Sequence, residues 1–207
     1  MTSHLPAFVG VSVLLALAPG PDFALVTRNA LAHGRRGALL TCAGLALGVG
    51  WWVVASTFGL SVLLQASASA YRALRLAGAV YLGYLGLRTL VESFGRGPSV
   101  DGAPGASPRG AALVRQGALS AGLNPKLGVF FVTFLPQFTD AGSPLGPQIL
   151  LLGTVFGLIG LLWMTGYGLA VSRLRAIVTR RAVRRGLERV SGCVLLAFAL
   201  RLAVDRG

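Results

Sequence analysis

Six apolar segments make up most of this chain, and all but the last are long enough to cross a lipid bilayer. A helix needs about 20 apolar residues to span the hydrocarbon. Only 12% of the 207 residues are charged, too few to cover a soluble protein of this size. We therefore expect an all-α, multi-pass membrane protein of about six transmembrane helices. The expected segments are residues 5–26, 37–64, 71–91, 117–138, 145–171 and 190–204.

Two of these segments are interrupted by proline next to a charged residue. The first interruption is residues 18–22 (APGPD) and the second is residues 122–126 (GLNPK). Proline removes a backbone donor, and lipid offers no water to replace the lost hydrogen bond. A charge at membrane depth costs about 3 kcal/mol or more. A chain that tolerates both costs twice is expected to form a binding site at these breaks.

The net charge of +13 comes from 18 arginines and a single lysine. Thirteen of the arginines lie in the connections after the first, third and fifth segments, and three lie on the opposite side. This asymmetry follows the positive-inside rule and makes nucleic-acid binding the weaker interpretation. If six segments span, both termini face away from the cytoplasm. If the first segment does not cross, five spans remain and the N-terminus is cytoplasmic.

A stretch rich in glycine, proline and serine divides the chain near its middle. We interpret residues 95–114 as a flexible aqueous linker between residues 1–94 and residues 115–207. Each half contains three apolar segments and begins with the proline-broken one. An odd number of segments makes the halves insert with opposite topology, as in transporters built from inverted repeats. The two halves share the same order of features, and this order supports the hypothesis better than the few residues that match between them.

Asp22 and Lys126 are the charged residues at the two breaks. Asp22 is the only carboxylate within a spanning segment, where it can bind a cationic group or a coupling proton. It can equally cap the helix that restarts after Pro21, or pair with Arg28. Lys126, the only lysine, can hold a substrate carboxylate or neutralise Asp22. Alternatively, the Lys126 side chain extends along the helix towards the membrane interface.

Other polar residues near the breaks are further candidates for substrate binding. Asn124 offers both a donor and an acceptor at the second break. Tyr81 can line a cavity, although aromatic packing is the more common role, and Gln137 is either an interface residue or a site residue. The geometry of the breaks themselves is expected to depend on Pro19, Gly20, Pro21 and Pro125.

Several motifs occur along the chain in a characteristic order. Residues 19–21 (PGP) are followed by a glycine-rich second segment, then by residues 78–86 (GAVYLGYLG), residues 124–126 (NPK) and residues 134–138 (FLPQF). Together they resemble the LysE/RhtB family of amino-acid exporters, over about residues 5–202. The resemblance rests on order and spacing, since none of these motifs is decisive alone.

The resemblance implies export of amino acids or their derivatives, of the homoserine, threonine or lysine class, across the inner membrane of a bacterium. It also implies coupling of transport to protons and contact with membrane lipid. A homodimer is one oligomeric state that the resemblance allows. The family's two proline motifs correspond to residues 19–21 and 124–126. The arginine-rich residues 172–189 are unusual for the family. They suit either an amphipathic helix on anionic lipid or a solvated loop.

Two other functional classes are weaker. An enzyme needs a nucleophile, an acid–base pair or metal ligands, and His4 and His33 lie at a terminus and in a loop. Export of a metal or another small cation is the second alternative. It calls for several acids, histidines or thiolates in the spans, where the sequence offers Asp22 with Cys42 and Cys193. We expect no cofactor, no bound metal and no catalytic residue.

Overall fold

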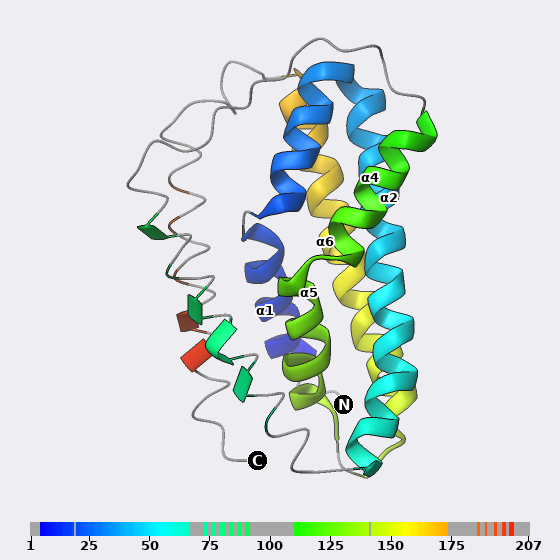
Figure 1. Ribbon diagram of the computed structural model, residues 1–207, viewed down its shortest axis with the longest axis vertical. Helices are drawn as coiled ribbons and strands as arrows, with labels where there is room; N and C mark the ends of the chain where they lie inside the picture. Colours follow the sequence, from blue (N-terminus) through cyan, green and yellow to red (C-terminus); the bar gives the residue numbers. More distant parts are fainter. Residues whose placement is uncertain are drawn as a thin grey trace.

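The structure, a computed structural model, describes residues 5–18, 20–66, 110–140 and 142–173, with isolated positions between 73 and 200. Within these ranges every regular element is a helix. The helices pack side by side along the long axis of the molecule (Figure 1). The all-α prediction is confirmed. Most of the third and sixth predicted segments, and residues 95–109 of the predicted linker, lie outside the described residues.

The first span is a broken helix. Helix α1 (Leu5–Leu17) has 13 residues, or ~20 Å, which is too short to cross the hydrocarbon alone. After the break, helix α2 (Pro21–Ala66) continues in the same direction before it turns back (Figure 1). The first apolar segment was expected to end near Val26, but the helix extends to the turn at Gly34 and therefore includes Arg28.

Gly34 turns α2 into a helical hairpin. Its φ of 59° and ψ of −148° lie in a region that side-chain-bearing residues rarely adopt. The two arms, residues 21–33 and 35–66, then run in opposite directions (Figure 1). They approach closely beside the turn, because a Cβ built on Gly37 would lie 2.2 Å from the carbonyl oxygen of Asn29.

The fourth predicted segment is also broken where the sequence indicated. Helix α4 (Gly110–Gly122) is followed by α5 (Pro125–Val129), the π-helix η1 (Phe130–Phe134) and the 3-10 helix η2 (Leu135–Phe138). The two parts are bent by 46°. Pro136 lacks the N–H that an α-helix needs, which accounts for the change of helix type after α5. Residues 110–114 of the predicted linker belong to α4.

Helix α6 (Leu145–Arg173) has no internal break. Its 29 residues give ~44 Å, enough to cross the bilayer with some tilt. It lies against both α1 and α2. Among the described residues, Pro21–Gly59 of α2 and Leu145–Arg173 are each long and apolar enough to span, and the bent pair Gly110–Gly122 and Pro125–Phe138 is so when its two parts are taken together.

Large apolar side chains face outward on these helices. The exposed fractions are 62% for Trp51, 72% for Phe58 and 73% for Leu162. Such a surface would promote aggregation in water, whereas lipid solvates it. The protein is therefore a polytopic membrane protein.

The described arginines of the connections mark one end of the bundle. Arg35 and Arg36 directly follow the turn at Gly34, Arg115 lies in α4 and Arg173 ends α6. The turn, the start of α4 and the end of α6 are all at the top of Figure 1. The positive-inside rule predicts that this arginine end faces the cytoplasm.

Glycines bring α2 and α4 into close contact. A Cβ built on Gly44 would lie 2.0 Å from the carbonyl oxygen of Val114, and one on Gly117 would lie 2.2 Å from that of Thr41. No side chain fits at these positions without separating the helices. Small residues at a helix interface allow this approach in membranes, and here it fixes α4 against the second arm of α2.

Gly44→Val is expected to destabilise the protein by about 3 kcal/mol, because the added atoms overlap the backbone of α4. The measurement is the thermal unfolding midpoint of the purified protein in detergent. Gly50→Val is the matched control on the same helix, since a Cβ at Gly50 meets no atom within 4 Å. Equal midpoints for the two variants would contradict the packing described for α2 and α4.

Candidate functional site

The two helix breaks meet and exchange contacts. The carboxylate of Asp22, after the first break, accepts hydrogen bonds from Ser120 Oγ and from Asn124 Nδ2, the latter at 2.9 Å. The ammonium group of Lys126, after the second break, donates to the carbonyl oxygen of Ala18 at 3.1 Å. Each break therefore binds the charged residue supplied by the other.

Both helices restart in the same way. Pro21 is the first residue of α2 and Pro125 the first residue of α5. Proline is well suited to this position because the first N–H of a helix has no partner within it. The charged residue comes second in each helix, so the two breaks place Asp22 and Lys126 at equivalent positions.

Asn124 has two roles at the second break. Its side-chain oxygen accepts from the backbone N–H of Lys126 at 3.0 Å and so caps α5. Its side-chain nitrogen donates to Asp22. A single amide thus joins the start of α5 to the start of α2.

The ends of the broken helices explain the placement of the charges. Asp22 lies in the first turn of α2, where the helix dipole favours a negative charge. Lys126 lies in the first turn of α5, where the dipole opposes a positive charge. Its ammonium group instead reaches the carboxyl end of α1, where the dipole favours a cation. Lys126 is only 7% exposed, so it does not extend to the membrane interface.

Other groups complete the breaks. Trp52 Nε1 donates to the carbonyl oxygen of Ala121 at 3.1 Å, which satisfies one of the acceptors left at the end of α4. The backbone of Gly20 lies beside the ammonium group of Lys126. Ser120 donates to Asp22 but was not among the site residues predicted from the sequence. The available signal was an isolated hydroxyl one turn before Asn124 in an apolar segment.

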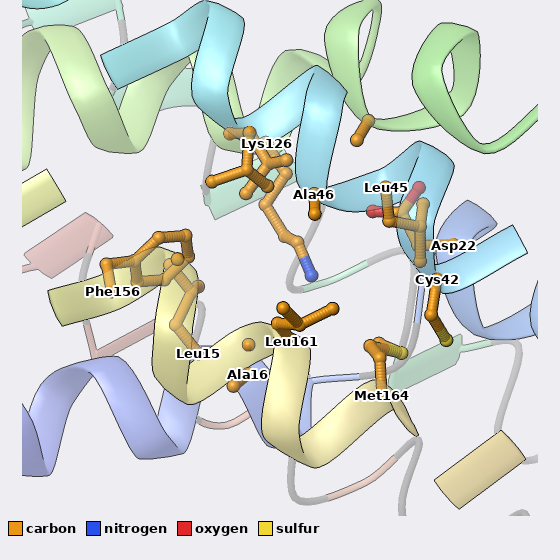
Figure 2. Close-up of a pocket in the computed structure, with 15 residues that line it drawn as sticks. Leu15, Ala16, Asp22, Cys42, Leu45, Ala46, Lys126, Phe156, Leu161 and Met164 are labelled. Atoms are coloured by element: carbon orange, nitrogen blue, oxygen red, sulfur yellow. The ribbon is translucent and has the colours of Figure 1, made fainter. Parts of the chain in front are cut away.

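A pocket lies between the breaks and α6. Figure 2 shows the ammonium group of Lys126 projecting into it, with Leu161 of α6 across from it. The residues that line the pocket are Leu15, Ala16, Asp22, Cys42, Leu45, Ala46, Val49, Ala121, Lys126, Leu127, Phe156, Gly157, Gly160, Leu161 and Met164.

Asp22 and Lys126 are the only charged residues in this lining of described residues. The two charges interact electrostatically, and the rest of the wall is apolar. Chemically, the pocket offers one anionic and one cationic group to a ligand and an apolar wall to the remainder of it. This arrangement suits a small zwitterion.

A polar network closes the bundle between Asp22 and the arginine end. The buried amide of Asn29 donates to Thr41 Oγ1 at 2.9 Å and to Gln116 Oε1 at 3.2 Å. The guanidinium group of Arg28 donates to the same oxygen at 3.0 Å. Gln116 thus joins α4 to the first arm of α2. Arg28 is engaged here, rather than with Asp22 as the sequence allowed.

An aromatic cluster fills the opposite end of the bundle. Its ring centroids are 4.5 to 6.3 Å apart, in edge-to-face, tilted and stacked pairs. The cluster joins the start of α1 to η1, η2 and α6 and excludes water from this end. Its members are Phe8, Phe130, Phe131, Phe134, Phe138 and Phe156.

The structure separates the residues expected at the site into two groups. It brings together Asp22, Asn124 and Lys126, with Gly20 and the two prolines that begin α2 and α5. Gln137 lies at the end of η2, where its side-chain nitrogen donates to the carbonyl oxygen of Thr133 at 3.0 Å, and Tyr81 is half-buried. Neither lines the pocket. Pro19 lies outside the described residues.

The family model for LysE type translocators matches residues 13–206. The chain belongs to this family. It is a membrane translocator and not an enzyme. No solved structure matches it.

Relatives of this translocator align over nearly its whole length. A homoserine/homoserine lactone efflux protein of Salmonella typhimurium is 29% identical over 97% of this chain and 96% of its own. A leucine efflux protein of Klebsiella pneumoniae is 28% identical, with coverages of 97% and 94%. An uncharacterized membrane protein of Bacillus subtilis is 25% identical, with coverages of 97% and 99%.

Asn124→Ser is expected to separate the two roles of Asn124. Serine retains the helix cap, but its shorter side chain cannot reach Asp22. We expect an unfolding midpoint close to that of the unsubstituted protein and transport reduced at least tenfold. Thermal unfolding in detergent and transport into proteoliposomes measure the two effects. Full transport by the variant would show that the bond to Asp22 is dispensable.

Proposed function

We propose that this translocator exports amino acids from the bacterial cytoplasm across the inner membrane by proton antiport. The observation that carries the proposal is the pocket with one carboxylate and one ammonium group in an otherwise apolar wall. The relatives named for homoserine and leucine efflux support the same class of substrate. The arginine end, which the positive-inside rule assigns to the cytoplasm, is the side from which the substrate would enter.

The two helix breaks would hold the two charges common to all amino acids. The substrate ammonium group binds beside Asp22, which accepts hydrogen bonds and carries the negative charge. The substrate carboxylate binds the ammonium group of Lys126, close to the amino-terminal end of α5, whose dipole favours anions. Binding shifts Lys126 from the Ala18 carbonyl towards the ligand.

Asp22 also provides a simple route to proton coupling. A protonated carboxyl group cannot form an ion pair with the substrate ammonium, so a proton and a substrate compete for Asp22. A proton entering from outside would release the substrate, and loss of that proton to the cytoplasm would prepare the site for the next one. This exchange gives antiport with Asp22 as the shared group.

Transport also requires that the pocket open to each side in turn. We propose the Arg28–Asn29–Gln116 network as the cytoplasmic closure and the aromatic cluster as the outer closure. The two breaks, with opposite helix directions and equivalent proline–charge pairs, support the hypothesis of inverted repeats. In such a design, each repeat would carry one half of the site.

Export of a metal or another small cation fits the pocket less well. A lone cation would gain one carboxylate and would be repelled by the buried ammonium group of Lys126. A zwitterion satisfies both charges. The pairing of opposite charges therefore favours amino acids over metal ions as substrates.

Asp22→Asn is expected to abolish proton-coupled export. In proteoliposomes loaded with labelled amino acids, an inward proton gradient should accelerate release by the unsubstituted protein and leave the variant unaffected. The amide retains a similar size and one acceptor, so the fold should persist. Asp140→Asn, in the connection between η2 and α6, is the control that removes a carboxylate elsewhere. If the proton gradient accelerates release by the Asp22→Asn variant as much as by the unsubstituted protein, the proton role of Asp22 is refuted.

Gln116→Leu is expected to weaken the cytoplasmic closure. The substitution removes the acceptor shared by Arg28 and Asn29 and should raise the accessibility of the pocket from the arginine end. Alkylation of Cys42, which lines the pocket, reports this access in inverted membrane vesicles. We expect labelling to become at least several-fold faster than in the unsubstituted protein. Unchanged labelling would argue against the network as a closure.

A further inference from the structure

We propose that the pocket selects amino acids with branched or linear aliphatic side chains, with Gly160 setting the largest size accepted. This inference rests on the proposed function, since it concerns the substrate of the same site. It departs from the homoserine, threonine or lysine class suggested by the resemblance. The evidence is the chemistry of the pocket wall beyond Asp22 and Lys126.

Asp22 and Lys126 can bind only the ammonium and carboxylate groups that all amino acids share. Asp22 and Lys126 both come from the helix breaks, on one side of the pocket. The opposite side is formed by α6, with Leu161 and Met164 facing the breaks (Figure 2). A substrate bound through its ammonium and carboxylate groups would direct its side chain towards α6.

The wall that would receive this side chain is apolar. It is formed by Leu45 and Val49 of α2 and by Phe156, Leu161 and Met164 of α6. The described lining contains no serine, threonine, asparagine or glutamine. A substrate hydroxyl would therefore lose its hydrogen bonds to water without replacement, and a second ammonium group would lack a carboxylate.

This difference predicts the order of substrates. Threonine and valine have nearly the same shape, so a pocket of this kind discriminates between them only through the hydroxyl group, by up to about 100-fold. Lysine carries an additional charge and should be excluded more strongly. Leucine, isoleucine and valine should be preferred.

Glycines provide the space for the side chain. Gly157 and Gly160 lie on the face of α6 that also carries Phe156 and Met164. A Cβ built on Gly160 meets no atom within 4 Å, although the residue lines the pocket. Because Gly160 has no side chain, it leaves open volume in the pocket. A larger residue would occupy that volume without moving neighbouring atoms of the protein.

The substrate order can be tested by counterflow in proteoliposomes. Vesicles with the purified protein are loaded with one unlabelled amino acid and take up the same amino acid in labelled form. We expect leucine, isoleucine and valine to drive uptake at least tenfold better than threonine or homoserine, with lysine inactive. Threonine equal to valine, or active lysine, would overturn this inference alone. If none of the amino acids is exchanged, the proposed function is overturned and this inference with it.

Gly160→Val tests the size limit. We expect the variant to lose at least tenfold of its exchange with leucine while it retains exchange with alanine. Gly166→Val is the matched control, because Gly166 is an exposed residue of the same helix whose Cβ would also meet no atom. Unfolding midpoints of both variants verify that they fold. Equal losses of leucine and alanine exchange, or an identical effect of Gly166→Val, would refute the role of Gly160.

Discussion

The exchange of contacts between the two helix breaks is the interaction on which the site depends. Asn124 binds Asp22, and Lys126 binds the carbonyl of Ala18. In lipid, a broken helix exposes backbone groups that water cannot satisfy, and a buried charge without a partner is costly. Bringing the breaks together relieves both penalties, because each break supplies the group that the other lacks.

The surrounding bundle holds this pair of breaks in place. Gly44 and Gly117 allow α2 and α4 to touch, which fixes the start of the second break. The aromatic cluster fixes α1 against η1 and η2, and Trp52 donates to the Ala121 carbonyl oxygen at the end of α4. The pocket lies on the face of the breaks towards α6. The proposed binding site is thus a place where the two charges have partners but the packing leaves space.

Much of this architecture could be predicted from residue patterns. Apolar length indicated the spans, and proline beside a charge located both breaks, because lipid makes these patterns costly wherever they lack a function. Local boundaries were less predictable. The helix before Gly34 continued beyond Val26, and α4 began at Gly110 within the expected linker. Arginines near the interface can lie on helices as readily as in loops, so charge alone does not end a helix.

The sequence by itself determined that this chain crosses a membrane as helices, that two of them break, and that the breaks carry opposite charges. It could not assign partners, since Ser120 and Gln116 are ordinary polar residues until packing places them beside Asp22 and Arg28. Likewise, Tyr81 and Gln137 were plausible site residues that do not line the pocket. Only the tertiary structure decided which groups meet, because contacts between residues about 100 positions apart depend on how the helices pack in three dimensions.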